Sequence, residues 1–209
     1  MSQFKDVSDI AYLTKGKRGV IYTGIYKRKK VAIKCKLPES KAIGRIENEA
    51  KWIARLNKHN IGPRLIYSCY DYFIYEFIEG EFIVDYIRKC SGDEAIRIIK
   101  NVFDQCFRMD KLGVNKEEMH HPVKHIIISS NTNQVVMLDF ERARYTQKPK
   151  NVTQLCQFIF RSELSEILEE KGIMLDKDKI EDLCSKYKKE ITEENLGKIL
   201  NLLHLNYIV

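Results

Sequence analysis

The first part of the chain alternates apolar and polar residues in the pattern of β-strands. In the stretch GVIYTGIYKRKKVAIKCKL, and over residues 10–36 as a whole, β-branched and aromatic side chains alternate with polar ones. A period of two places the apolar side chains on one face of a sheet. The polar run at 26–30 interrupts the pattern, so we expect a hairpin whose tip lies there.

Helical spacing follows. Between Ile46 and Leu56 apolar residues recur every three or four positions, and a glycine–proline pair at 62–63 comes next. This spacing predicts a helix within residues 41–62 that stops at the pair. The following stretch, RLIYSCYDYFIYEFIEG, predicts two strands on either side of a turn at 70–71.

The second part of the chain has a different pattern. Residues 91–113 predict a long helix, with Ser91 or Asp93 as its cap and Gly113 at its end. HIIIS and VVMLDF predict two short strands joined by a turn at 130–133. After Lys150 we expect helix to the end of the chain, with a break near 171–172. The order of elements predicts an α+β protein with a β-rich N-terminal lobe, 1–79, and a helical C-terminal lobe, 80–209.

Composition adds little to this prediction. The 209 residues are 44% hydrophobic and carry a net charge of +7, which favours anionic partners such as nucleotides, nucleic acid or acidic proteins. The six cysteines form no C-x-x-C pair and predict reduced thiols in a cytoplasmic protein. We expect no signal peptide, and no apolar run reaches the roughly 18 residues of a membrane span.

Two stretches of the predicted sheet carry candidate chemistry. TKGKRGVI contains Gly16 and Gly19, whose backbone amides could face a phosphate, although such glycines usually make only a turn. In VAIK, which ends at Lys34, strand alternation places Lys34 on the same face as small Ala32, beneath the glycine turn. The small side chain leaves room there for a planar ligand.

Acidic residues further along could complete a site. Glu49, in the helix that follows the VAIK strand, could reach Lys34 and hold its ammonium toward a phosphate; Glu47 is the competing residue, and a surface glutamate is the ordinary alternative. Asp139 ends an apolar strand, a common position for a metal-binding carboxylate and also for a turn cap.

Taken together, these stretches resemble the signature motifs of protein kinases in their usual order. TKGKRGVI is similar to the glycine loop, with Thr14 in the first glycine place and Ile21 in the valine place. VAIK matches outright. YEFIEG resembles the hinge between the lobes, where the backbone groups of Glu76 and Ile78 would meet adenine. LDFERAR resembles the D-F-G segment, with Glu141 in the glycine place.

The nearest resemblance is to small atypical kinases. The chain after Asp139 is short and has no A-P-E segment, as in the RIO kinases and the small kinase of the KEOPS complex. It looks closest to an archaeal group described as predicted serine/threonine kinases, whose catalytic loop reads roughly H-G-E-L-x-R-P-x-K-H; residues 116–125 here read KEEMHHPVKH. The resemblance covers about residues 10–145. It implies a two-lobed kinase-like fold, ATP as substrate, Mg²⁺ or Mn²⁺ as cofactor, and a protein acceptor of unknown identity.

The catalytic loop departs from H-R-D-x-x-x-x-N. One alignment puts Glu118 in the place of the catalytic aspartate, and counting back from His125 puts His120 there. We prefer Glu118, because its carboxylate can take the proton of the hydroxyl that receives the phosphate. His125 occupies the asparagine place but is a poor ligand for Mg²⁺. The metal is therefore expected on Asp139, with His125 as a weaker candidate.

Other interpretations stay open. The loss of the aspartate and asparagine suggests a pseudokinase that binds nucleotide and acts as an interaction module. The lack of a long peptide-docking segment suggests a kinase of small molecules. His121 and His125 are spaced as in some zinc sites, without a third ligand. The basic surface suggests RNA, but no RNA-binding motif supports it.

Overall fold

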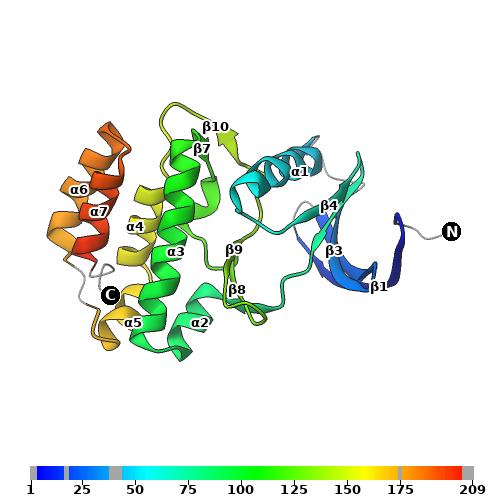
Figure 1. Cartoon of the computed structure of the whole chain (residues 1–209), viewed down its shortest axis with the longest axis horizontal. Coiled ribbons are helices and arrows are strands. Elements are labelled where there is room, and N and C mark those ends of the chain that lie inside the picture. Colours follow the sequence, from blue (N-terminus) through cyan, green and yellow to red (C-terminus); the bar gives the residue numbers. More distant parts are fainter. Residues whose placement is uncertain (1–3, 17–18, 38–43, 174–175, 204–209) are drawn as a thin grey trace. The chain divides into compact units, whose positions relative to one another are not determined.

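The computed structural model describes residues 4–16, 19–37, 44–173 and 176–203, and it is an α+β protein (Figure 1). A β-sheet makes up most of the N-terminal part, and helices dominate the C-terminal part. The chain forms two compact units, one of residues 1–79 and 136–143, the other of residues 80–135 and 144–209. The segment 136–143, which the sequence analysis assigned to the C-terminal lobe, thus belongs to the first unit.

The first unit is built on a five-stranded antiparallel sheet in the order β1-β2-β3-β5-β4. Its strands are β1 (Val7–Lys15), β2 (Gly19–Tyr26), β3 (Lys29–Lys36), β4 (Leu65–Ser68) and β5 (Tyr72–Glu76). The predicted hairpin tip is confirmed: Lys27 and Arg28 join β2 to β3 with φ angles of 47° and 64°. Two residues of positive φ suit the twist of a tight hairpin.

Alternation along β3 separates two environments. Val31 and Ile33 point into a core with Phe4, Val7 and Ile74 on one face of the sheet. Ala32 and Lys34 therefore lie on the other face, as the pattern predicts. Helix α1 (Arg45–Leu56) packs against β3, β4 and β5.

The buried stripe of α1 follows the predicted spacing. The helix begins after Gly44, which has a φ of 76°, and it continues into the short 3₁₀ helix η1 (Asn57–His59). The Asn57 side chain donates to the carbonyls of Ile61 (3.1 Å) and Pro63 (3.0 Å). The glycine–proline stop is thus reinforced by a side chain that holds the loop closed.

The second unit opens with short strands around a long helix. The predicted helix at 91–113 is α3, and Ser91 is its cap, accepting from the Glu94 amide at 3.2 Å. β6 pairs with β8, which turns at 129–134 into β9. The elements of this part are β6 (Gly80–Phe82), α2 (Ile83–Lys89), α3 (Gly92–Lys111), β7 (Val114–Asn115), the 3₁₀ helix η2 (Glu117–His120), β8 (Ile126–Ser129), β9 (Val135–Met137) and β10 (Arg144–Tyr145).

The helices after Lys150 are more broken than predicted. Gly172, with φ 78°, accounts for the expected break, but the chain also leaves helical geometry near Ser162 and Glu190. α4 contacts α3, α5 and α6, and α6 contacts α7. These helices are α4 (Asn151–Arg161), α5 (Leu164–Glu170), α6 (Lys177–Lys189) and α7 (Glu193–Leu202).

All six cysteines are free. Among the described residues, no helix combines the length and the apolar character that crossing a membrane requires.

Candidate functional site

Lys34 lies at the centre of an ionic cluster in the first unit. Its Nζ atom is 2.6 Å from Oε2 of Glu49 and 3.3 Å from Oδ1 of Asp139. Only 13% of the Lys34 side chain is exposed, and 4% of that of Glu49. Residues from β3, α1 and the segment after β9 thus converge on one ammonium group.

The local structure explains why Glu49 reaches Lys34. Strand alternation places Lys34 on the face of β3 opposite the Val31–Ile33 core, and α1 packs against β3 with Glu49 on its buried stripe. Glu47 is only half-buried and has no ion pair with Lys34. Glu49, rather than Glu47, is therefore the partner of Lys34.

Asp139 follows the strand instead of ending it. β9 ends at Met137, and Asp139 has a φ of 61°, in the left-handed region. Aspartate tolerates this region better than most residues, at a cost of order 1 kcal/mol. Neighbouring contacts hold the segment: the Asn48 side chain donates to the Glu141 carbonyl at 3.0 Å, and Phe140 is buried against Gly62.

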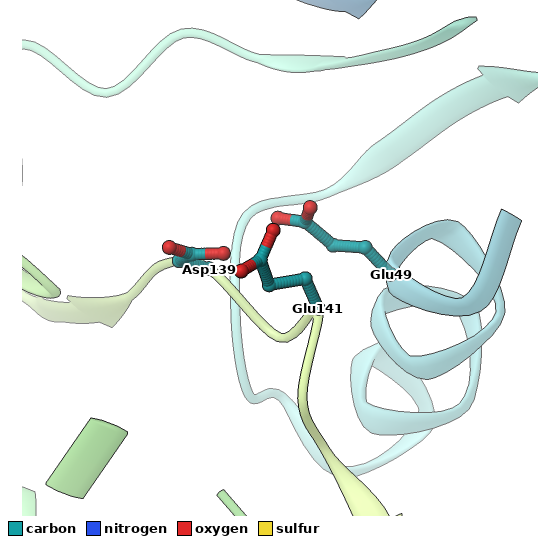
Figure 2. Close-up of side chains that lie close together, drawn as sticks. All are labelled: Glu49, Asp139 and Glu141. Atoms are coloured by element: carbon teal, nitrogen blue, oxygen red, sulfur yellow. The ribbon is translucent and has the colours of Figure 1, made fainter. Parts of the chain in front are cut away.

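Glu141 adds a third carboxylate. Figure 2 shows the side chains of Glu49, Asp139 and Glu141 turned toward one another, and one oxygen from each lies within 4.8 Å of the others. Arg45 and Arg142 each approach the Glu141 carboxylate to 3.9 Å. Sequence reasoning noted Glu141 only as a departure from D-F-G; its separation of two residues from Asp139 was the available signal.

The donor set of this cluster suits a hard divalent cation. Mg²⁺ and Mn²⁺ prefer carboxylate oxygens, and three are present. Glu49 is 4% exposed and Lys34 holds it at 2.6 Å, whereas Asp139 is 29% exposed with a longer contact to Lys34, 3.3 Å, and Glu141 is 10% exposed. Asp139 and Glu141 are therefore the residues that could hold such an ion.

Burial and charge act in opposite directions on the titration of this cluster. Burial disfavours the Lys34 ammonium, but Glu49 and Asp139 outweigh it and hold the Lys34 pKa above its ordinary value. Burial raises the pKa of Glu49 to about 7, against the lowering effect of Lys34, and the Asp139 carboxylate adds to the rise. Lys34 stays charged at neutral pH, and the crowded carboxylates favour any further cation that binds beside them.

Tyr75 is a site residue that the sequence did not reveal. It pairs with Ala32 across β3 and β5, and its ring centroid is 5.4 Å from that of Phe73. Burial, and then the Glu49 carboxylate, raise the pKa of its phenol. A large, partly buried aromatic ring thus lies beside the small Ala32 on the Lys34 face of the sheet.

The glycine turn approaches Lys34 from β2. The Gly16 amide donates to the Gly19 carbonyl at 2.9 Å; residues 17 and 18 lie outside the described residues. A Cβ atom on Gly19 would be 2.8 Å from the Cys35 carbonyl oxygen and 3.7 Å from the Lys34 side chain. Gly19 is therefore required for close approach to β3, and Ile21 pairs with Lys34 in the same register.

The segment after β5 holds the two expected adenine contacts. The Glu76 amide donates to the Arg64 carbonyl at 2.9 Å, so its carbonyl oxygen is the remaining candidate. The Ile78 amide has no partner in the described part of the chain. Lys30 pairs with Glu79 at 2.7 Å and lies 4.3 Å from the Phe77 ring centroid, which holds this segment beside the start of β3.

Glu118 lies in the second unit, on η2. Its side chain is 10% exposed, and its Oε2 atom is 3.4 Å from Nζ of the fully buried Lys116. The Lys116 amide donates to Oδ1 of Asn151 at 2.8 Å, and the Asn151 side chain donates to the Val114 carbonyl at 2.6 Å. The start of α4 therefore fixes the backbone that leads into Glu118.

Asp110 anchors the same network. It accepts from the amides of Asn151 (3.0 Å) and Val152 (3.1 Å), from the Asn151 side chain (2.7 Å) and from the Tyr187 hydroxyl (3.0 Å). Sequence reasoning missed Asp110 and Asn151. An asparagine at the start of an expected helix was the only signal for the group.

His120, His121 and His125 each have a different contact. His120 Nδ1 is 2.6 Å from the Glu117 carbonyl oxygen, and the His121 ring makes an edge contact with Phe158 at 6.2 Å. The His125 amide donates to the Pro122 carbonyl at 2.9 Å. In the residues that the structure describes, the one grouping suited to a metal consists of carboxylates and includes no histidine.

Comparison with known proteins assigns no family. Neither the scan against protein-family models nor the search of curated proteins found a match to this chain.

Proposed function

We propose that this protein is an ATP-dependent phosphotransferase, a minimal atypical kinase of two-lobed kinase-like fold that modifies serine or threonine in a protein acceptor. The observation that carries the proposal is the meeting of Lys34, Glu49 and Asp139 in the first unit, at 2.6 and 3.3 Å. These residues come from three stretches that resemble the kinase motifs in order. The two compact units are compatible with two lobes.

In this proposal the first unit holds the nucleotide. Lys34, oriented by Glu49, binds the phosphates, and the amides of the Gly16–Gly19 turn cover them. The Glu76 carbonyl and the Ile78 amide meet the adenine edge, while Ala32 and Tyr75 flank its plane. A divalent ion on Asp139 and Glu141 would neutralise charge that develops on the phosphates.

The second unit supplies the group that receives the proton. The acceptor oxygen forms a bond to the γ-phosphorus as the bond from that phosphorus to the β,γ-bridging oxygen breaks, and ADP leaves. The hydroxyl proton passes to the Glu118 carboxylate. Because little covalent chemistry is asked of the protein, positioning and charge supply most of the catalysis.

One observation favours a second candidate, a pseudokinase that binds nucleotide without turnover. The Glu118 side chain is largely buried and is engaged by Lys116, which limits its access to an acceptor. Both candidates require nucleotide binding and differ only in turnover.

The test begins with the affinity for ATP. Lys34→Met keeps much of the side-chain length and removes the charge, so we expect ATP affinity to fall about tenfold or more, measured by isothermal titration with Mg²⁺ or Mn²⁺. Lys29→Met, at an exposed position of the same strand, is the matched control and should bind as the parent does. Equal affinity in folded Lys34→Met and parent would refute the proposal.

Turnover then separates the two candidates. We expect the parent to transfer label from γ-labelled ATP to itself or to an added protein when Mg²⁺ or Mn²⁺ is present. Binding of ATP without transfer under both metals, and with a range of acceptors, would instead support the pseudokinase.

A further inference from the structure

A groove of about 220 Å³ lies beside the two-stranded sheet of the second unit, in which β10 pairs with β7. Its walls include Asn115, Glu117, Thr146 and three cations, Arg144, Lys148 and Lys150. Nothing in the proposed nucleotide site uses these cations.

The charge of the groove is unbalanced. Arg144 donates to the Glu117 carboxylate. The Nζ atoms of Lys148 and Lys150 have no carboxylate partner in the ranges that the structure describes, and both side chains are exposed. Three cations and one carboxylate leave a net charge of +2 on a concave surface, which concentrates the positive potential there.

Other lysines of the same unit show the contrast. Lys186 pairs with Asp182 and Lys198 with Glu194, both at 2.6 Å and both with the i,i+4 spacing of a helix. Such pairs cancel charge along a solvated helix. Lys148 and Lys150 lie outside any helix, so they lack this local route to a partner.

The backbone that carries the cations is held in place. The Lys150 amide donates to Oδ1 of Asn115 at 2.8 Å, and the Thr146 amide donates to the Gly113 carbonyl at 2.8 Å. Arg144 lies opposite Asn115 in the β7–β10 register. These bonds fix the backbone that carries the cations relative to β7, so a ligand would have to order only the exposed lysine side chains.

The groove adjoins the element that carries Glu118. Glu117, which lines the groove, directly precedes Glu118, and both lie on η2. A chain whose side chain occupies the groove would therefore bring its neighbouring residues to the element on which the proton acceptor of the proposed reaction lies.

We infer that this groove recognises an acidic side chain, that of aspartate, glutamate or a phosphorylated residue, close to the acceptor hydroxyl of a protein substrate. The inference rests on the proposed function and names its substrate class. A carboxylate or phosphate would pair with Lys148 and Lys150 and compete with Glu117 for Arg144.

The dimensions and charges favour a peptide over a nucleic acid. A volume of about 220 Å³ suits one or two side chains. The Glu117 carboxylate within the wall opposes a continuous line of phosphates, whereas a single acidic group can avoid it. Single-stranded nucleic acid is usually bound along an extended basic track with stacking aromatics.

Peptide binding without nucleotide tests the inference. A fluorescent peptide with one serine between aspartates is titrated with the full chain, and anisotropy reports binding. We expect the Lys148→Glu/Lys150→Glu double variant to lose roughly tenfold or more in affinity. The matched control, Lys100→Glu/Lys189→Glu, changes the net charge equally at exposed helix positions of the same unit and should change affinity about twofold at most.

A second variant works in the opposite direction. Glu117→Gln removes the repelling carboxylate and frees Arg144, so we expect tighter binding of the acidic peptide, by roughly threefold. A control peptide with lysines in place of the aspartates should bind the parent much more weakly than the acidic one.

Several results would overturn the inference. It is wrong if the acidic peptide binds no better than the basic one, or if the groove variant binds as its control does. If single-stranded RNA bound the parent more tightly than the acidic peptide, and lost that affinity in the groove variant, the groove would be a nucleic-acid site.

The outcome is separable from that of the proposed function, because the peptide assay contains no ATP. Normal ATP binding with no acidic preference refutes only the inference about the groove. If the acidic peptide binds but Lys34→Met leaves the ATP affinity unchanged, the inference about the groove stands and the phosphotransferase proposal is refuted.

Discussion

Asp139 has a backbone conformation that most residues avoid, with φ at 61°. Its carboxylate also lies beside those of Glu49 and Glu141. Both features cost free energy in the folded state, and Lys34 at 3.3 Å offsets part of the repulsion. Costs of this kind concentrate at functional sites, which supports a role for Asp139 beyond a turn cap.

Asp139→Asn separates a role in metal binding from a role as a turn cap. Asparagine also tolerates positive φ, so the segment should keep its conformation. The loss of one carboxylate should weaken Mn²⁺ affinity by roughly tenfold, measured by isothermal titration in the presence of a non-hydrolysable ATP analogue. Asp71→Asn, at an exposed turn of the same unit, is the control. If the metal titrations of Asp139→Asn and the parent coincide, Asp139 is only a turn residue.

Glu118 and His120 lie on the same turn of η2 and compete for the role of proton acceptor. Glu118→Gln keeps the shape and removes the base, so turnover should fall by roughly 10²–10⁴-fold while ATP affinity stays the same. His120→Ala should reduce turnover far less, because the preferred alignment puts Glu118, and not His120, in the place of the catalytic aspartate. Steady-state phosphotransfer rates of both variants decide which residue is the proton acceptor. Loss of turnover only in His120→Ala would assign that role to His120.

Single residues differed in how well the sequence predicted them. Lys34 and Glu49 could be predicted as a pair because strand alternation and helix spacing each place one side chain. Tyr75 and Asn151 could not, because their contacts involve elements distant in sequence: Tyr75 lies opposite Ala32 of β3, and Asn151 at the start of α4 holds the backbone of Lys116. Periodicity alone carries no information on such contacts.

Gly16 and Gly19, at the two ends of the turn between β1 and β2, differ in whether a side chain could be accommodated. At Gly19 a Cβ atom would meet the Cys35 carbonyl at 2.8 Å, closer than such contacts occur, whereas at Gly16 the nearest atom would be 3.7 Å away. The two positions are therefore a matched pair in one turn. The constraint at Gly19 comes from the adjacent strand β3 and not from the turn itself.

We expect Gly19→Ala to push β2 away from β3 and from Lys34. The variant should lose about 1–3 kcal/mol in unfolding free energy and bind ATP more weakly, whereas Gly16→Ala should change stability by less than about 1 kcal/mol. Urea unfolding followed by Trp52 fluorescence, which reports on the first unit, measures the difference. Equal stability of the two variants would contradict the close approach at Gly19.

Long periodic elements were predicted well, and so were the short apolar strands β8 and β9, but α2, β7 and β10 were not. The strands of the five-stranded sheet, α1 and α3 have periodic patterns that the sequence displays directly. α2 is a helix of seven residues with no side-chain cap, and β7 and β10 have two residues each. Such short elements are stabilised by tertiary pairing and carry too few positions for a period to appear.

At the scale of the whole molecule, chain order and compact units differ. Residues 136–143 return to the first unit after the chain has begun the second, and they bring Asp139 and Glu141 to the cluster at Lys34. The boundary near Gly80 was predicted from the change between a strand-like and a helical sequence pattern along the chain. Such a pattern does not reveal that a later segment returns to the first unit, because that return depends on long-range contacts.

The second unit is held together by a buried polar network at Asp110, which connects α3 to the start of α4 and, through Tyr187, to α6. Burial raises the pKa of Asp110 to about 6, although four hydrogen bonds oppose the rise. In the unfolded chain the pKa returns to about 3.9. The folded state therefore binds the proton more tightly than the unfolded state between these two values.

This difference predicts how stability depends on pH. Because the folded state holds the proton more strongly, Asp110 makes the unfolding free energy fall as pH rises from about 4 to about 6, by about 3 kcal/mol at most, with no further change above that range. Asp110→Asn cannot titrate and lacks this dependence, although the loss of acceptor atoms destabilises it at every pH. The unfolding free energy of the parent minus that of the variant should therefore decrease by about 1–3 kcal/mol between pH 4 and pH 7. Urea unfolding followed by far-UV circular dichroism measures it, with Asp104→Asn, an exposed position on the same helix, as the control that should show no such decrease. A difference that is constant with pH would mean that Asp110 is ionised throughout, and that the hydrogen bonds from Asn151, Val152 and Tyr187 outweigh its burial.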